Sequence, residues 1–221
     1  VMALTGEIVQ LKVRLLGISP MIWRRLLVPA SMTLQELHGV LQVAMGWEGI
    51  HLFSFDIHAV GYGSFELSLA DPRVALGSFD LRKNDKVSYV YDMGDHWEHE
   101  IRVEEFGKSA PKKSYPICIG GSGTCPPEDC GGPHGFLERR DEADGYDAWQ
   151  DMGLMVEWLD DVMQTANPHQ TVRDVLTDDI EAAMHRVIAR EPYQTGKFSR
   201  KLVNEAFRAE RHRELMHQQL A

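Results

Sequence analysis

The chain has 221 residues, and its 33 acidic side chains outnumber the 23 lysines and arginines to give a formal net charge of −10. This length allows one large domain, or one domain with an appendage, because domains usually contain roughly 100–200 residues. A hydrophobic content of 43% excludes wholesale disorder. No apolar run approaches the ~18 residues of a membrane span, and no signal peptide is evident. We therefore expect a cytoplasmic protein with no membrane partner.

The first half of the chain reads as β-strands around a single helix. Alternating residues with one apolar face predict a strand over 8–15, and residues 21–28 predict a second strand that Pro29 closes. The capping box Thr33-Leu-Gln-Glu36 begins a helix that Gly46 ends, and apolar residues recur along it with a 3.6-residue period. Further strands are predicted over 51–59, 65–69, 86–91 and 97–106.

The second half changes character. Residues 107–135 are rich in glycine, proline and cysteine and predict a long irregular loop, a kind of segment that often carries function. Beyond it, helices are predicted over 141–161, 178–190 and 199–219. The fold class is therefore α+β, a mostly antiparallel sheet with a packed helix, plus a helical C-terminal third. We divide the chain into an α+β domain over 1–137 and a helical extension over 138–221 that packs on it.

Two features of the helical third concern partners. Residues 141–161 carry eight acids and no lysine or arginine, and their apolar residues recur at helical spacing. The last predicted helix has an apolar side that includes Leu202 and Phe207. This side docks either on its own chain or on a partner, for example a second copy in a homodimer.

Several motifs occur in one order along residues 7–137 and together resemble a known family. They are Ser19-Pro-Met-Ile-Trp-Arg-Arg25, Leu37-His38 with Leu41-Gln42, Met45-Gly-Trp47, His51-Leu52, Tyr91-Asp-Met-Gly-Asp95 with Trp97 and His99, and Cys125-Pro-Pro-Glu-Asp-Cys-Gly-Gly132. They are similar to the plasmid pRiA4b ORF-3-like family. The resemblance implies an α+β fold with no firmly assigned activity. Some members carry a transposon-resolvase (TnpR-like) label or are linked to mobile elements.

The resolvase label does not fit the residues. A serine resolvase needs a nucleophilic serine near its N-terminus, arginines to stabilise phosphoryl transfer, and a basic helix-turn-helix. Here the first serine, Ser19, lies in a predicted turn, and Arg24 and Arg25 point to opposite faces of a strand. We therefore expect a non-catalytic accessory or binding module associated with mobile elements, whose protein or small-molecule ligand is unknown.

A histidine cluster supports an alternative function. If the predicted faces pack together, His38, His51 and His99 approach one another near the turn that carries Asp92 and Asp95. Histidines beside carboxylates bind transition metals or shuttle protons, which is the chemistry of a metal-dependent hydrolase or nuclease. The other interpretation is that each histidine is buried and satisfied by a neighbour. The candidate binding cleft is completed by Gln42, Tyr91, Trp97, Glu128 and Asp129.

All three cysteines, Cys118, Cys125 and Cys130, fall in the irregular loop. With His99 or His134 as a fourth ligand they would form a zinc site, although no pair has the close C-x2-C spacing. An oxidised pair and three reduced packing thiols are the alternatives. Three cysteines are too few for a secreted disulfide scaffold, which again indicates the cytoplasm.

A third hypothesis is DNA binding through one strand. Trp23 and Arg25 share one face of the strand over 21–28, and Arg24 lies on the other. Arginine beside tryptophan suits stacking or phosphate binding, but the acidic net charge disfavours a nucleic-acid partner. The alternative is that each arginine pairs with a nearby acid.

Overall fold

The computed structural model describes residues 7–164, 176–193 and 197–217. Contacts divide the chain into two compact units. The first comprises residues 1–133 and 196–221, and the second comprises residues 134–195. The helical segment over 138–221 is thereby shared between the units, because its last helices pack within the first unit.

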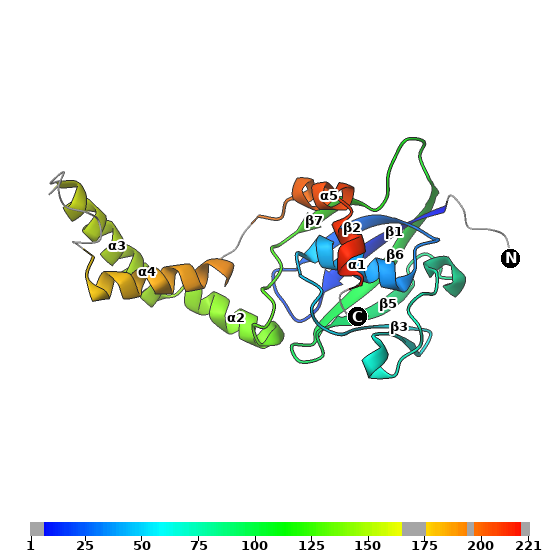
Figure 1. Cartoon of the computed structure of the whole chain (residues 1–221), viewed down its shortest axis with the longest axis horizontal. Coiled ribbons are helices and arrows are strands. Elements are labelled where there is room, and N and C mark those ends of the chain that lie inside the picture. The colour runs from blue at the N-terminus through cyan, green and yellow to red at the C-terminus, as the bar shows by residue number, and fades with distance from the viewer. Residues whose placement is uncertain (1–6, 165–175, 194–196, 218–221) are drawn as a thin grey trace. The chain divides into compact units, whose positions relative to one another are not determined.

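One antiparallel sheet forms the first unit, with the strand order β4-β3-β5-β6-β1-β2-β7 (Figure 1). Its strands are β1 (Glu7–Leu15), β2 (Trp23–Pro29), β3 (Phe53–Ile57), β4 (Val60–Gly63), β5 (Lys86–Tyr91), β6 (Trp97–Lys108) and β7 (Ile117–Ser122). Alternate residues of the central strands are buried, as with Val13, Leu26 and Tyr89. The predicted α+β fold class is confirmed.

Helix α1 (Leu34–Met45) packs across this sheet. It begins at the predicted capping box, in which Thr33 Oγ1 accepts from the Glu36 backbone N–H at 3.2 Å and the Glu36 carboxylate accepts from the Thr33 backbone N–H at 2.8 Å. It ends at Gly46, whose φ of 96° is a left-handed conformation that glycine adopts without strain. Every residue of α1 except Glu36 is buried. Sheet and C-terminal helices together therefore enclose it.

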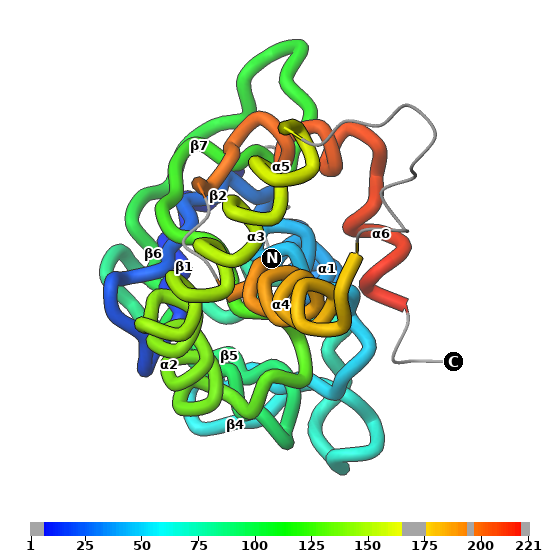
Figure 2. The backbone as a smooth tube through the Cα atoms, turned by 90° about the vertical axis from the view of Figure 1, so that its left-hand side faces the viewer, coloured from blue at the N-terminus to red at the C-terminus, as the bar shows by residue number. Residues whose placement is uncertain are grey.

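The C-terminal helices α5 (Arg200–Arg208) and α6 (Arg211–Leu215) complete the first unit, with α6 alongside α1 (Figure 2). The sequence predicted one helix over 199–219, whose last two residues lie outside the described part. That prediction is wrong, because Glu210 adopts a φ of 58° and turns the chain. A side chain at Gly39 of α1 would collide with the carbonyl oxygen of His212. The two backbones can therefore approach only because glycine occupies this position.

Two further predictions at the sheet edges are wrong. The strand expected over 65–69 begins as a 3-10 turn, and β4 pairs with β3 in its place. The irregular loop expected over 107–135 contains β7, which pairs with β2. Two glycines within this strand interrupt its alternation. Its pairing also depends on Asn204 of α5, which accepts from the Cys118 backbone N–H and donates to the Cys118 carbonyl, both at 2.8 Å.

The second unit is helical, with α2 (Gly132–Ala143) entering it, followed by α3 (Tyr146–Gln164) and α4 (Asp178–Arg190). Asp151 of α3 is buried and accepts from Arg186 at 2.7 Å and from Arg190, both on α4. These hydrogen bonds, chiefly from Arg186, lower the pKa of Asp151 to about 2. No helix in the described ranges combines the length and apolar character that a bilayer crossing requires.

Candidate functional site

Three side chains from distant parts of the sequence meet at one end of the sheet. His51 precedes β3, Asp92 follows β5, and Asp129 lies between β7 and α2. Nε2 of His51 lies 3.6 Å from Oδ2 of Asp92 and 3.1 Å from Oδ1 of Asp129. One ligand atom of each residue lies within 4.8 Å of the others. We call these three residues the surface cluster, because the side chains of His51 and Asp129 are 25% and 67% exposed.

The turn after β5 presents one carboxylate oxygen to this cluster. Oδ1 of Asp92 accepts hydrogen bonds from the backbone N–H groups of Gly94 at 2.9 Å and Asp95 at 3.2 Å. This Asx-type arrangement leaves Oδ2 facing His51. Asp95, also predicted for the site, accepts instead from the backbone N–H of Gly131 at 3.1 Å. It therefore fixes the loop that carries Asp129.

The loop before α2 is held by two further aromatic residues. Nε1 of Trp47 donates to the Pro126 carbonyl at 2.9 Å, and the Tyr91 hydroxyl donates to the Glu128 carboxylate. Burial raises the pKa of Tyr91, so its hydroxyl stays protonated and able to donate. Glu128 also accepts from the backbone N–H of Glu48 at 3.0 Å. The position of Asp129 is therefore set by its neighbours.

Two other predicted site histidines belong to a separate, buried network. His38 and Gln42 both meet the Tyr89 hydroxyl, at 2.7 Å from Nδ1 of His38 and 2.9 Å from Nε2 of Gln42. Nδ1 of His99 lies 3.3 Å from the Tyr89 carbonyl oxygen. All four side chains are completely buried. Burial lowers the pKa of His38 to about 3 and of His99 to about 4, so both imidazoles are neutral at pH 7.

The Tyr89 hydroxyl joins two side chains of α1, because Nε2 of Gln42 donates to it and Nδ1 of His38 lies at hydrogen-bond distance from it. Nε2 of His38 has no hydrogen-bond partner among the described residues. Trp97, the remaining predicted aromatic, is also buried, with its ring 5.9 Å from that of Trp47. Sealed from solvent, these groups contribute to the core and not to a cleft.

Tyr89 and Trp47 were not predicted as site residues, although each organises one of the two polar regions. A signal for Tyr89 was available in the sequence. Tyr89 lies two residues before Tyr91 in the strand over 86–91, so the two side chains lie on the same face of the strand, which is the face towards the core. Trp47 lies just beyond the end of α1, where periodicity gives no direction for its side chain.

The predicted Trp23, Arg24 and Arg25 lie as alternation requires, on two faces of β2. Arg24 is 2% exposed, and its guanidinium donates to backbone carbonyls, including that of Ala44 at 2.7 Å. Arg25 makes a bidentate pair with Glu104 at 2.6 and 2.9 Å. Its guanidinium also lies 5.2 Å from the Trp23 ring. Both arginines are already engaged within the chain.

The predicted cysteine site is not assembled. Within the described part of the chain, no three ligand atoms from Cys118, Cys125, Cys130 and His99 lie within 4.8 Å of one another. Burial raises the pKa of the Cys125 thiol to about 12, which keeps it protonated, and the buried cation of Arg24 lies near Cys118 and Cys125. His134, the alternative ligand, is exposed and faces Glu138 at 3.4 Å.

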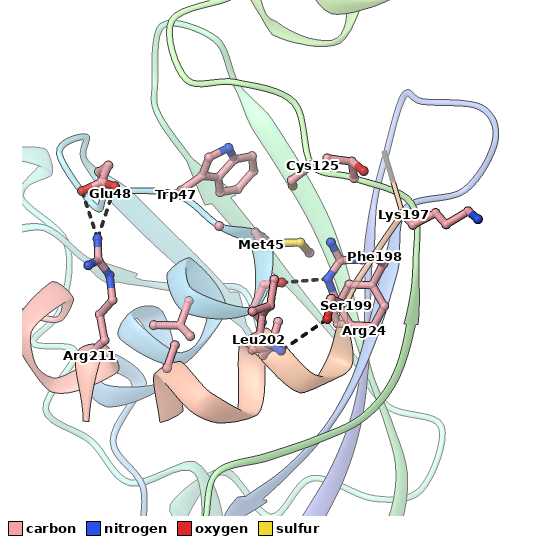
Figure 3. A pocket seen from close by; sticks show the side chains of 16 residues that line it. Arg24, Met45, Trp47, Glu48, Cys125, Lys197, Phe198, Ser199, Leu202 and Arg211 are labelled. Carbon is pink, nitrogen blue, oxygen red and sulfur yellow. Dashed lines mark hydrogen bonds and ion pairs between the residues drawn. The ribbon is translucent and has the colours of Figure 1, made fainter. Parts of the chain in front are cut away.

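A groove of about 320 Å³ lies between the end of α1 and α5 (Figure 3). Arg24 lines it, with its guanidinium carbon 4.2 Å from the centre of the Phe198 ring, and Arg211 pairs with Glu48 at 3.3 Å. Its aliphatic lining comprises Val43, Ala44, Leu202, Val203 and Ala206. Two of the three cations that line the groove, Arg24 and Arg211, are thus engaged already. The groove therefore offers mainly apolar contact.

The second unit presents an apolar surface of another kind. Large side chains recur along α3 at alternating spacings of three and four residues and are 47–77% exposed: Trp149, Met152, Val156, Leu159 and Met163. We call these five residues the α3 stripe. Asp151, on another face of the helix, binds α4. The helix is therefore fixed from one side while its stripe faces solvent.

The fold and these sites define an α+β protein built on a seven-stranded antiparallel sheet. The family model described as plasmid pRiA4b ORF-3-like protein matches residues 7–170, and the chain belongs to this family. The resemblance predicted over 7–137 is thus confirmed and extends beyond α3.

Two relatives support the assignment. "Uncharacterized protein y4hQ" of Sinorhizobium fredii is 37% identical over an alignment of 146 residues that covers 61% of this chain and 72% of that protein. The crystal structure of Protein of Unknown Function MM3350 from Methanosarcina mazei Go1 is similar with a TM-score of 0.60 at 30% identity. That match covers 64% of this chain and 83% of the other.

Proposed function

We propose that this protein is a non-catalytic accessory module that binds a protein partner through the α3 stripe. The observation that carries the proposal is the exposure of five large apolar side chains in one row on a helix. Soluble proteins rarely leave such a contiguous apolar surface in water unless it is an interaction site. Alternating spacings of three and four residues are those by which one helix packs lengthwise against another.

The partner we propose is a basic amphipathic helix. Residues 141–161, which include most of α3, carry eight acids and no lysine or arginine. Two copies of this helix would repel each other, whereas lysines or arginines flanking an apolar partner stripe would be attracted. The same charge would hasten the encounter at low salt. Apolar spacing and charge thus favour the same kind of partner.

The placement of the histidines supports a binding role over the hydrolase alternative. His38 and His99 are completely buried and engaged with Tyr89, so neither reaches a substrate. Their burial also keeps their imidazoles neutral, which supports the interpretation that these histidines belong to the core. Of the predicted hydrolase set, His51 and Asp92 remain in the surface cluster.

DNA binding is disfavoured by the same kind of argument. Arg24 is buried and Arg25 is paired with Glu104, so the strand offers neither guanidinium freely to a phosphate.

A cytoplasmic location is part of the proposal, because the thiols of Cys118 and Cys125 are free. Association with mobile elements is also part of it, supported by the plasmid reading frame in the family description.

The test uses a synthetic helical peptide of three heptads, with leucine at its core positions and lysine on its flanks. Isothermal titration calorimetry with the full chain should detect binding that weakens as salt rises. Replacing a central stripe residue, as in Val156→Asp, should weaken binding by at least about tenfold. Leu202→Asp is the matched control, because Leu202 is 65% exposed on α5 in the first unit.

Retention of binding in Leu202→Asp and its loss in Val156→Asp supports the proposal. Equal binding by both variants, or none by the unaltered chain, contradicts it. Sedimentation equilibrium tests the remaining possibility, which is that the chain associates with a second copy of itself through the α3 stripe. Self-association that Val156→Asp abolishes would identify a second copy as the occupant and overturn the basic partner.

A further inference from the structure

We propose that the surface cluster is a binding site for a divalent transition-metal ion of the Zn²⁺ or Mn²⁺ class. His51 supplies an imidazole nitrogen, and Asp92 and Asp129 supply one carboxylate oxygen each. A nitrogen with two oxygens is a donor set that such ions accept, with water at the remaining positions. This inference is independent of the α3 stripe and of any partner.

The distances between the donor atoms match those around a common ion. Zn–N and Zn–O bonds are about 2.0–2.2 Å long, so neighbouring ligand atoms on a four- to six-coordinate ion lie roughly 3.0–3.5 Å apart. The distances from His51 Nε2 to the two carboxylates are 3.1 and 3.6 Å. All three atoms lie within 4.8 Å of one another, so the two carboxylate oxygens need to approach each other by at most about 1.3 Å to reach such a spacing.

The electrostatics of the cluster also suit a cation. Nε2 of His51 is shielded from solvent and makes no hydrogen bond of acceptable geometry with the described residues, although two carboxylates adjoin it. Within those residues, Asp92 and Asp129 form ion pairs with His51 and with no lysine or arginine. Glu128 adds further negative charge beside Asp129 in the sequence. Two carboxylates without a permanent cation provide the field that attracts a divalent ion.

An ion at this position would connect three segments that are far apart in the chain. The ligands come from the segment before β3, the turn after β5 and the loop before α2. Outer contacts already orient two of them, through the Gly94 N–H on Asp92 and the Trp47 contact to Pro126 in the loop. Such supporting contacts are typical of metal sites. Binding should therefore raise the melting temperature of the folded chain.

The experiment is a calorimetric titration of tag-free, chelator-washed full chain with ZnCl₂ and with MnCl₂, together with melting curves. We expect one ion per chain and a higher melting temperature. His51→Ala and Asp129→Asn should each weaken binding by more than the about 10–100-fold typical of losing a supporting contact. Asp129 is 67% exposed, so Asp129→Asn should fold even if His51→Ala does not.

Two control variants distinguish other sources of binding. His134→Ala removes an exposed histidine beside Glu138, and Cys118→Ser with Cys125→Ser and Cys130→Ser removes the thiols. Binding that survives in these controls and is lost in Asp129→Asn supports the site. Binding that depends on the thiols or on His134 overturns it, as does full binding in Asp129→Asn or none by the unaltered chain at millimolar metal.

Discussion

Helices α1 and α3 have similar apolar periodicity but opposite surroundings. In α1 every residue except Glu36 is buried, and even the polar His38 and Gln42 are enclosed. In α3 the apolar stripe is exposed, and Asp151 provides the buried contact to α4. An amphipathic pattern therefore states that a helix has an apolar face but not what covers it. In α1 the cover is the chain's own sheet and C-terminal helices, whereas for α3 we propose a partner.

The largest expected effect comes from a pair of matched leucine-to-alanine substitutions, one in each helix. Leu41 of α1 is completely buried, so Leu41→Ala should lower the free energy of unfolding by about 2–5 kcal/mol through lost burial and the cavity left behind. Leu159 of α3 is 48% exposed, so Leu159→Ala should change it by no more than about 0.5 kcal/mol. Urea unfolding measures both. Comparable losses would remove the distinction between the two helices.

Acidification tests the polar side of α1. His38 and His99 have folded pKa values of about 3 and 4 against an ordinary 6.5. Below pH 6.5 the unfolded chain binds protons that the folded chain excludes, so stability falls as the pH drops towards those values. Between pH 7.5 and pH 5 each histidine should cost about 2 kcal/mol of unfolding free energy. Urea titrations at the two pH values measure the loss.

A substitution identifies the source of this pH dependence. His38→Gln removes one of the two completely buried histidines and should reduce the loss between pH 7.5 and pH 5 by about 2 kcal/mol. A stability that is flat over this range in the unaltered chain would contradict burial of neutral imidazoles.

The smallest expected effect concerns the contact that fixes α3. Asp151→Asn keeps the shape of the side chain but removes the charge that Arg186 and Arg190 bind, so α3–α4 packing should weaken by about 1–3 kcal/mol. Amide hydrogen exchange should quicken in α3 and α4 and stay unchanged in α1. Glu157→Gln, on an exposed position of α3, is the control. Faster exchange in α1 as well would show that the two units are not independent in stability.

Local signals predicted most of the fold. The capping box and Gly46 defined α1, and period-two alternation located β1, β5 and β6. The β7 strand was missed because Gly120 and Gly121 interrupt its alternation and because its pairing depends on β2 and Asn204, which are distant in the sequence. The break at Glu210 was missed for a related reason. A left-handed glutamate has no local advantage, and its conformation accompanies the packing of α6 on Gly39.

The candidate site was predicted as residue types but not as an arrangement. His38, His51 and His99 were expected together, and the structure instead separates His51 from the other two by burial. Asp129 was expected in the cleft, but its place beside His51 depends on a loop held by Trp47 and Tyr91. Spacing along the chain cannot predict such contacts, because loop conformation is set by distant anchors.

The sequence by itself determined the α+β class, the family and the helix and strand periods, because these depend on neighbouring residues and on motif order. Only the tertiary structure decided which polar groups were sealed in the core and which were left at the surface. His38 and His51 are the same side chain, thirteen positions apart. Burial makes one a neutral part of the core, whereas the other lies partly exposed beside two carboxylates, where we propose that it binds a metal ion.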